Sequence, residues 1–186
     1  MTTRTSAMVR AMGWQTIVKP ALRPCESVKV QNDPIGDSVT LGTLGNARIA
    51  ENLADGADLH NLPEGWTFLG SGCYRTCYLG PDGIVYKVDS DEGEHSSNSV
   101  ELRVFKECAH LMPESVRLCP TNYLSPRVNA MEMAGTQRGN LSNNLARLVT
   151  IATRGQGKWG GVSDLHGGNV RYDTLTDIYT IIDFAQ

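Results

Sequence analysis

Residues 163–169 read SDLHGGN, and residues 181–185 read IIDFA. The first stretch carries Asp164 and, five residues later, Asn169; the second carries Asp183, which lies 14 residues beyond Asn169. Asp183 ends an apolar, strand-like run, and a carboxylate at such a boundary is suited to hold Mg²⁺ between phosphates. The two stretches therefore predict a site for a metal ion and a nucleotide, provided that other segments supply the groups that bind phosphate.

The polar loop that contains Asp164 and Asn169 follows an apolar helical stripe at 141–152 and precedes two short predicted strands. A polar loop with two glycines can be an ordinary connection, but this position suits a catalytic loop. In that interpretation Asp164 accepts the proton of an attacking hydroxyl, and Asn169 binds a metal ion.

A glycine-containing hairpin occurs earlier in the chain, where Gly70, Ser71 and Gly72 separate two predicted strands. Because glycine has no Cβ, the backbone at Gly70 and Gly72 can approach phosphates closely. Taken alone this signal is weak, since a glycine-rich hairpin is more often only a turn. Arg75 follows in the same hairpin, and we expect it either to narrow the turn or to contact phosphate directly.

Lys87 lies in the middle of a predicted strand and has apolar neighbours on either side. A single Lys on a strand is usually a solvated residue of the outer face. The functional interpretation is an inward Lys that holds the α- and β-phosphates and is itself held by an acid on the next helix. Glu101 is the preferred acid, and Glu107, six residues later on a different helical face, is the competitor.

Hydrophobic periodicity and turn signals predict an α+β domain over residues 63–186. Residues 1–62 lack a clear period, and we expect either a loosely ordered arm or a segment that docks on this domain. The predicted helices carry apolar stripes over residues 100–108 and 141–152. The predicted strands lie, in chain order, at residues 66–69, 77–79, 84–88, 122–124, 127–133, 169–172 and 178–182.

Composition excludes some classes of function and location. The formal net charge of −3 argues against a general nucleic-acid binder, which usually carries a basic excess. No run approaches the ~18 consecutive apolar residues of a membrane span, so no membrane partner is expected. The five cysteines are an odd number and form no CxxC pair. Free thiols in a reducing cytoplasm are therefore expected.

From Pro63 to Gln186, about two-thirds of the chain, the sequence resembles the protein-kinase-like superfamily. The corresponding elements are a phosphate loop at Gly70 and Gly72, a β3 lysine at Lys87, a helix αC acid at Glu101, a hinge at residues 131–134, a catalytic loop at residues 164–169 and a DFG-like metal-binding element at residues 183–185. The wording D-L-H-x-x-N is similar to that of aminoglycoside phosphotransferases, and LPEGW at residues 62–66 is similar to small kinase-like proteins of bacteriophages.

The resemblance implies a kinase-like N-lobe, which is an antiparallel sheet plus helix αC, and a much reduced, mainly helical C-lobe. It implies ATP and Mg²⁺ as cofactors, with Asn169 and Asp183 on the metal and the backbone of Glu132 and Met133 at the adenine edge. His166 stands where protein kinases commonly carry a Lys, so it is either near the γ-phosphate or merely structural. The phosphate acceptor, a protein or a small molecule, is open, and a phage protein would work in the host-cell cytoplasm.

The sequence also departs from the family pattern. Arg75 replaces the third glycine of the phosphate loop, Ser163 stands where protein kinases have Arg, and Ala185 replaces the DFG glycine. The sequence stops three residues after Asp183, so we expect the reduced C-lobe to be covered by residues 1–62, by a second copy of the chain or by a partner.

Two functions follow from these expectations. The first is a Mg-ATP-dependent phosphotransferase. The alternative is a pseudokinase-like module that binds nucleotide or a partner without catalysis, which the short C-lobe, Arg75 and Ala185 favour.

Overall fold

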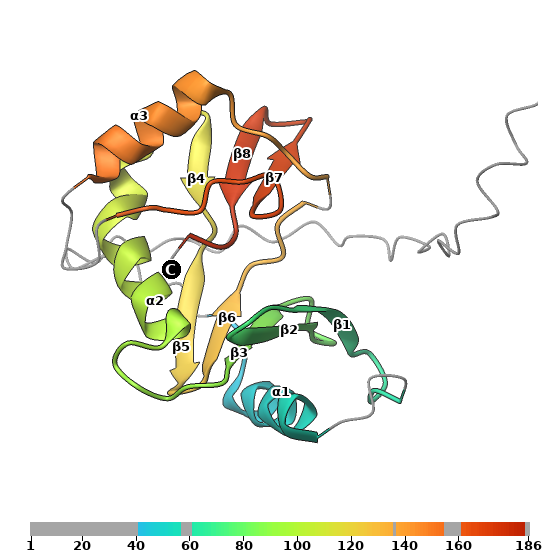
Figure 1. Ribbon diagram of the computed structural model, residues 1–186. Helices are drawn as coiled ribbons and strands as arrows, with labels where there is room; N and C mark the ends of the chain where they lie inside the picture. Colours follow the sequence, from blue (N-terminus) through green and yellow to red (C-terminus); the bar gives the residue numbers. More distant parts are fainter. Residues whose placement is uncertain (1–40, 57–60, 136, 155–160, 185–186) are drawn as a thin grey trace, which may run out of the picture. The chain divides into compact units, whose positions relative to one another are not determined.

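The computed structural model describes residues 41–56, 61–135, 137–154 and 161–184. Ala185 and most of the predicted N-terminal arm lie outside these ranges. A mixed α+β structure with an antiparallel sheet is present, as predicted, and Figure 1 shows the arrangement of its helices and strands.

A five-stranded sheet with the order β1-β2-β3-β6-β5 forms the first half of the fold, and every neighbouring pair in it is antiparallel. Its strands are β1 (Thr67–Ser71), β2 (Arg75–Leu79), β3 (Val85–Asp89), β5 (Thr121–Ser125) and β6 (Val128–Met131). All five are confirmed predictions of the sequence pattern. β3 is buried along its whole length, which makes it the central strand on which the site is built.

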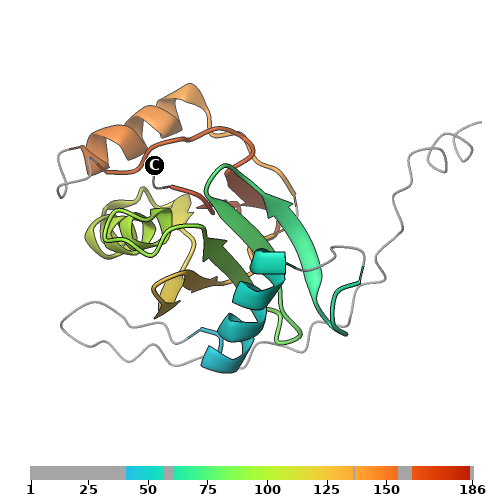
Figure 2. The same ribbon diagram turned by 60° about the horizontal axis from the view of Figure 1, so that its bottom comes forward.

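Helices cover both faces of this sheet (Figures 1 and 2). Helix α1 (Leu44–Gly56) buries Ala47, Ala50 and Leu53 in a cluster that also contains Tyr86 of β3. On the other face, Val85 of β3 belongs to the cluster of helix α2 (Ser97–Cys108). Since successive strand residues point to opposite faces, Lys87 points to the side of α2.

Helix α2 is the predicted helix between residues 100 and 108. The Ser96 hydroxyl caps its first turn by accepting a hydrogen bond of 3.2 Å from the backbone N–H of Ser99. Val100, Val104 and Cys108 recur every four residues and are buried, as expected for the core-facing stripe of a helix. A short 3₁₀ turn, η2 (Ala109–Leu111), follows it.

The second half of the fold contains a three-stranded sheet with the order β4-β8-β7. Strands β7 (Val170–Asp173) and β8 (Ile178–Ile181) are the predicted antiparallel pair, whereas β4 (Val116–Leu118), which pairs with β8 in parallel, was not predicted. Helix α3 (Asn143–Thr153) matches the predicted apolar stripe. A mainly helical C-lobe is not confirmed, because within the described residues this half holds α3 and a sheet. The helices in the described ranges all fall short of the length and apolarity that crossing a bilayer requires.

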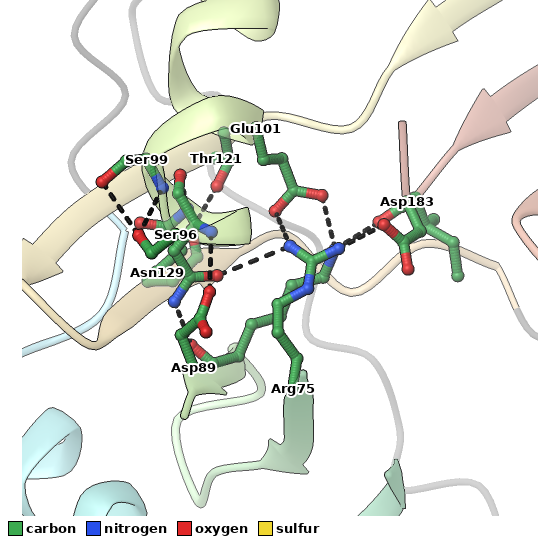
Figure 3. A network of polar contacts seen from close by, with 12 residues as sticks. Arg75, Asp89, Ser96, Ser99, Glu101, Thr121, Asn129 and Asp183 are labelled. Carbon is green, nitrogen blue, oxygen red and sulfur yellow. Dashed lines mark hydrogen bonds and ion pairs between the residues drawn. The ribbon is translucent and has the colours of Figure 1, made fainter. Parts of the chain in front are cut away.

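A buried amide joins the start of α2 to the sheet. Asn98 is fully buried, and its Nδ2 donates to the carbonyl of Lys87 at 2.9 Å and to the carbonyl of Arg127 at 2.7 Å. Its backbone N–H donates to Asp89 Oδ2 at 3.0 Å, and Asn129 donates to its carbonyl at 2.8 Å. The network, part of which is drawn in Figure 3, fixes the first turn of α2 against the strand that carries Lys87.

We therefore expect Asn98→Ala to lower the free energy of unfolding by about 2 kcal/mol, because the carbonyls of Lys87 and Arg127 each lose a buried hydrogen bond from the Asn98 amide. The Arg127 carbonyl keeps its bond from the Asp89 N–H. Urea denaturation followed by circular dichroism measures this. Asn144→Ala is the matched control, because Asn144 is exposed in the first turn of α3 and its change is expected to stay within about 0.5 kcal/mol. Equal stability of the two variants would contradict the assigned role of Asn98.

Candidate functional site

Lys87 and Glu101 form a buried ion pair across β3 and α2. Lys87 Nζ lies 2.7 Å from Glu101 Oε1, and the side chains are 6% and 0% exposed. The inward interpretation of Lys87 therefore matches the structure better than a solvated outer-face residue. Glu101 is the acid that faces it, since Glu107 lies on a different face of the same helix.

The same Lys87 also reaches the second sheet. Its Nζ donates to the carbonyl of Ile182 at 2.5 Å, and Ile182 directly precedes Asp183. The backbone N–H of Ile182 in turn donates to the carbonyl of Asn169 at 2.8 Å. On the other side of Asp183, the N–H of Ser163 donates to the carbonyl of Phe184 at 3.4 Å. These bonds hold the segment around Asp183 between Lys87 and the predicted catalytic loop.

Asp164 and Asn169 contact each other within that loop. Asn169 Nδ2 donates to Asp164 Oδ2 at 2.7 Å and to the Asp164 carbonyl at 3.2 Å. Asp164 has a φ of 55°, in the left-handed region that few residues other than glycine, Asn and Asp adopt readily. Because Asn169 uses its amide nitrogen on Asp164, its amide oxygen is the atom left to bind a cation.

His166 lies at the exposed edge of the loop, with its side chain 61% exposed. Its Nδ1 accepts a hydrogen bond of 3.0 Å from the backbone N–H of Gly168, and its Nε2 lies 3.4 Å from Asp164 Oδ2. The imidazole therefore both shapes the turn and borders the carboxylate, so the geometry is compatible with either role considered for it.

Arg75 enters the site from β2. Its guanidinium lies between two carboxylates: Nη1 donates to Glu101 Oε2 at 2.9 Å, and Nη2 is ion-paired with Asp183 Oδ1 (Figure 3). The Arg75 side chain is only 9% exposed. Burial lowers the pKa of Arg75, but the Glu101 and Asp183 carboxylates together raise it by more, so the group stays a cation. The sequence pattern predicts Arg75 in the turn or at the phosphates, and it does not predict these two carboxylate partners.

Four charges thus alternate in one cluster, which we call the ion cluster: the cations Arg75 and Lys87 and the carboxylates Glu101 and Asp183. Their formal charges sum to zero. In this cluster each buried charge has an opposite charge in contact, so none is left unpaired in the interior. Asp183, whose side chain is 35% exposed, is the member that solvent reaches most readily.

The oxygen ligands that the site offers fit Mg²⁺ rather than a softer metal. Asp183 and Asn169 would hold it through a carboxylate and an amide oxygen, and Mg²⁺ is commonly bound by one or two carboxylates together with waters and substrate phosphates. In the described part of the chain, no three His, Cys, Asp or Glu side chains gather into a metal-binding cluster. A metal ion here would therefore take its remaining ligands from water or from phosphate oxygens.

The glycine hairpin offers space rather than donors. Gly72 donates its N–H to the carbonyl of Arg75 at 2.8 Å, and Ser71 Oγ lies 3.2 Å from Thr76 Oγ1. Among the residues that the structure describes, a Cβ added at Gly72 would meet only the Arg75 carbonyl oxygen, at 3.9 Å, and one added at Gly70 would meet no atom within 4 Å. The inner surface of the hairpin is thus open to a close approach.

A cavity of about 340 Å³ lies beside the tip of this hairpin, and its lining includes Gly72, Arg75 and Arg127. Lys87 and Asp183, both among the described residues, are not part of its lining. The cavity is therefore adjacent to the predicted phosphate loop and touches the ion cluster only through Arg75.

The predicted hinge is only partly available to a ligand. The N–H of Glu132 donates to the Pro120 carbonyl at 3.1 Å, and its carbonyl accepts from Cys119 Sγ at 3.2 Å. Its carboxylate lies 3.4 Å from Arg117. Met133, by contrast, is 40% exposed, so of the two predicted adenine contacts it is the one whose surroundings leave room.

Two buried thiols near the site, those of Cys119 and Cys77, are not suited to act as nucleophiles. Burial raises the pKa of the Cys119 thiol to about 12, and burial also raises the pKa of Cys77, against the opposing effect of Lys87 and Arg75. A thiol with a raised pKa carries little thiolate at neutral pH. The chemistry that the site supports is that of its carboxylates and cations.

Sequence reasoning missed two contributors to the site, Asn98 and the Arg75 ion pairs. The position of Arg75 could have been inferred from its spacing to Cys77. Residues two apart on a strand share a face, and Cys77 pairs with Lys87 in the sheet, so Arg75 lies on the same face as Lys87. The signal for Asn98 was weaker: a polar residue in the first turn of a helix is normally a solvated or capping group.

No family model matches this sequence, and a search of curated proteins gives no match. Among solved structures, the chain is similar to the ternary complex of the aminoglycoside phosphotransferase APH(2")-IIa with streptomycin and ATP, with a TM-score of 0.35 and 21% identity. The match covers 57% of this chain and 36% of that one, so this chain spans little more than a third of that structure's length.

We expect Glu101→Gln to lower the free energy of unfolding by about 3 kcal/mol, because Arg75 and Lys87 lose the carboxylate between them and breaking a buried ion pair costs about 3–5 kcal/mol. Chemical denaturation monitored by Trp fluorescence measures the change. Glu107→Gln is the control on the same helix, and we expect it to change stability by less than about 0.5 kcal/mol. A larger loss in the control than in Glu101→Gln would overturn the assignment.

Proposed function

We propose that this protein is a Mg-ATP-dependent phosphotransferase of the protein-kinase-like superfamily, which transfers the ATP γ-phosphate to a hydroxyl acceptor. The observation that carries the proposal is the Lys87–Glu101 ion pair, with Lys87 also bonded to the residue that precedes Asp183. A strand lysine held by a helix glutamate, beside a metal-binding aspartate, is the arrangement on which protein kinases depend.

Lys87 binds the α- and β-phosphates in this proposal, and Glu101 keeps its ammonium group in place. Gly70 and Gly72 let the hairpin backbone lie close to the phosphates, where Ser71 is a further polar group. Asn169 and Asp183 hold Mg²⁺, which, when bound, neutralises charge on the phosphates. The purine edge lies near Met133 at the hinge.

Asp164 is the base. The acceptor oxygen forms a bond to the γ-phosphorus, the bond from that phosphorus to the β–γ bridging oxygen breaks, and ADP leaves with the electron pair. The hydroxyl proton passes to the Asp164 carboxylate, which Asn169 orients through the 2.7 Å hydrogen bond.

The alternative is a module that binds a nucleotide or a partner protein without catalysis. The ion pair between Arg75 and Asp183 favours it, since this contact occupies the carboxylate that a metal ion needs. The acceptor hydroxyl, on a protein or on a small molecule, is left open in both cases, and so is a homodimer or partner that covers the second half of the fold.

The proposal predicts that ATP with Mg²⁺ stabilises the protein and that ATP with EDTA does so less. A ligand at a hundred times its dissociation constant adds about 2.7 kcal/mol, which raises the melting temperature by several degrees. Each variant is compared with its own ligand-free baseline. In Asp183→Asn the Mg²⁺-dependent part of the shift is expected to vanish, and in Asp91→Asn, an exposed aspartate outside the site, it is expected to persist. If ATP changes the melting temperature of neither the unmodified protein nor the variants, the proposed nucleotide site is wrong.

Asp164→Asn separates catalysis from binding. Asparagine keeps an oxygen that accepts from Asn169 and tolerates a positive φ, so the loop is expected to keep its structure. We expect ATP turnover, measured as ADP release, to fall by about 100-fold or more, while ATP affinity measured by calorimetry stays within about threefold. Loss of ATP binding, or turnover equal to that of the unmodified protein, would remove Asp164 from the role of base. Binding of ATP without turnover in the unmodified protein would favour the non-catalytic alternative.

A further inference from the structure

Arg75 and a divalent metal ion require the same carboxylate. Nη2 of Arg75 is ion-paired with Asp183 Oδ1, and Asp183 is the one carboxylate assigned to the metal in the proposed function. A guanidinium in contact with a carboxylate neutralises it and repels a second cation at short range. The two cations therefore compete for Asp183.

The two contacts of Arg75 differ in how easily they can be exchanged. Glu101 is fully buried and lies 2.9 Å from Nη1, whereas the Asp183 side chain is 35% exposed. The contact with Glu101 fixes the guanidinium in the interior, and the contact with Asp183 is the one that a solute can reach. If Asp183 is released, Arg75 keeps one carboxylate partner and is not left as an unpaired buried charge.

We propose that Arg75 is a resident counter-cation that excludes a free divalent ion from Asp183, so that the metal binds only together with a phosphate ligand. The inference rests on the proposed function. When Asp183 turns to the metal, the guanidinium loses a negatively charged partner, and the phosphate group replaces it. A guanidinium is well suited to this exchange, because its N–H groups donate hydrogen bonds to phosphate oxygens. Arg75 thereby determines the cation requirement of the site.

Mn²⁺ alone, without nucleotide, is the probe, and its binding to the full chain is measured by water-proton relaxation or by electron paramagnetic resonance. The unmodified protein is expected to bind Mn²⁺ no more tightly than Asp183→Asn. Arg75→Gln is expected to bind it about tenfold more tightly, which is about 1.4 kcal/mol, because the charge-assisted contact with Asp183 no longer competes. Arg75→Lys, which keeps the cation, is the matched control and is expected to gain less.

The double variant Arg75→Gln/Asp183→Asn assigns any gain to this site, because the gain must disappear in it. The inference is overturned if Arg75→Gln binds Mn²⁺ no more tightly than the unmodified protein, or if the gain persists in the double variant. If Arg75→Gln fails to fold, the inference is tested by comparing Mn²⁺ binding of the unmodified protein with that of Asp183→Asn. Clearly tighter binding by the unmodified protein would show that Arg75 does not exclude the ion from Asp183.

The ATP thermal shift of the unmodified protein separates this outcome from failure of the proposed function. If ATP raises the melting temperature in a Mg²⁺-dependent way but Arg75→Gln gains no Mn²⁺ affinity, the nucleotide site is supported and the role assigned to Arg75 is wrong. A Mn²⁺ gain in Arg75→Gln without any ATP shift supports the competition at Asp183 and removes the nucleotide site.

Discussion

The buried carboxylate of Glu101 is the interaction on which the rest of the site depends. It accepts Lys87 on one oxygen and Arg75 on the other, and these two cations reach the segment around Asp183 through the Ile182 carbonyl and through Asp183 itself. A single fully buried acid on α2 therefore ties β2, β3 and the end of β8 to one point. Because an unpaired charge in the interior is far more costly than a paired one, the three buried members, Arg75, Lys87 and Glu101, are held to one another.

The position of Glu101 is itself set by a second polar contact, one turn earlier on the same helix. The Asn98 side chain donates a hydrogen bond to the carbonyl of Lys87. The residue that supplies the ammonium group of the ion pair is therefore also the residue to which the helix that carries Glu101 is attached. The Asn129 side chain on β6 donates to the carbonyl of Asn98, although its own Oδ1 is buried and finds no hydrogen-bond partner among the described residues. A well-packed apolar helix end would avoid that cost, so the polar contacts here specify the placement of α2 rather than maximise stability.

The sequence was informative where chemistry depends on local spacing, and less so where it depends on pairing between distant segments. Lys87 and Glu101 could be matched because a strand and the next helix are local, and the loop from Asp164 to Asn169 is contiguous. Helix α1 was missed because its buried face consists mainly of alanines, which give little periodic contrast. Strand β4 was missed because it is three residues long and gains its partner, β8, from a remote part of the chain. Arg75 was read as part of a turn, yet β2 begins at this residue.

The register of β2 and β3 explains why the Arg75 side chain reaches the site, and this direction could in principle have been predicted from the sequence. In β2 and β3, Arg75 lies opposite Asp89 and Cys77 lies opposite Lys87. Opposite residues of an antiparallel pair share a face, so the side chains of Arg75 and Lys87 both point toward α2. A glycine at this position would leave Asp183 and half of the Glu101 carboxylate to water or to a ligand. With arginine, the site carries its own counter-charge, so a ligand has to exchange an existing ion pair instead of entering an anionic pocket.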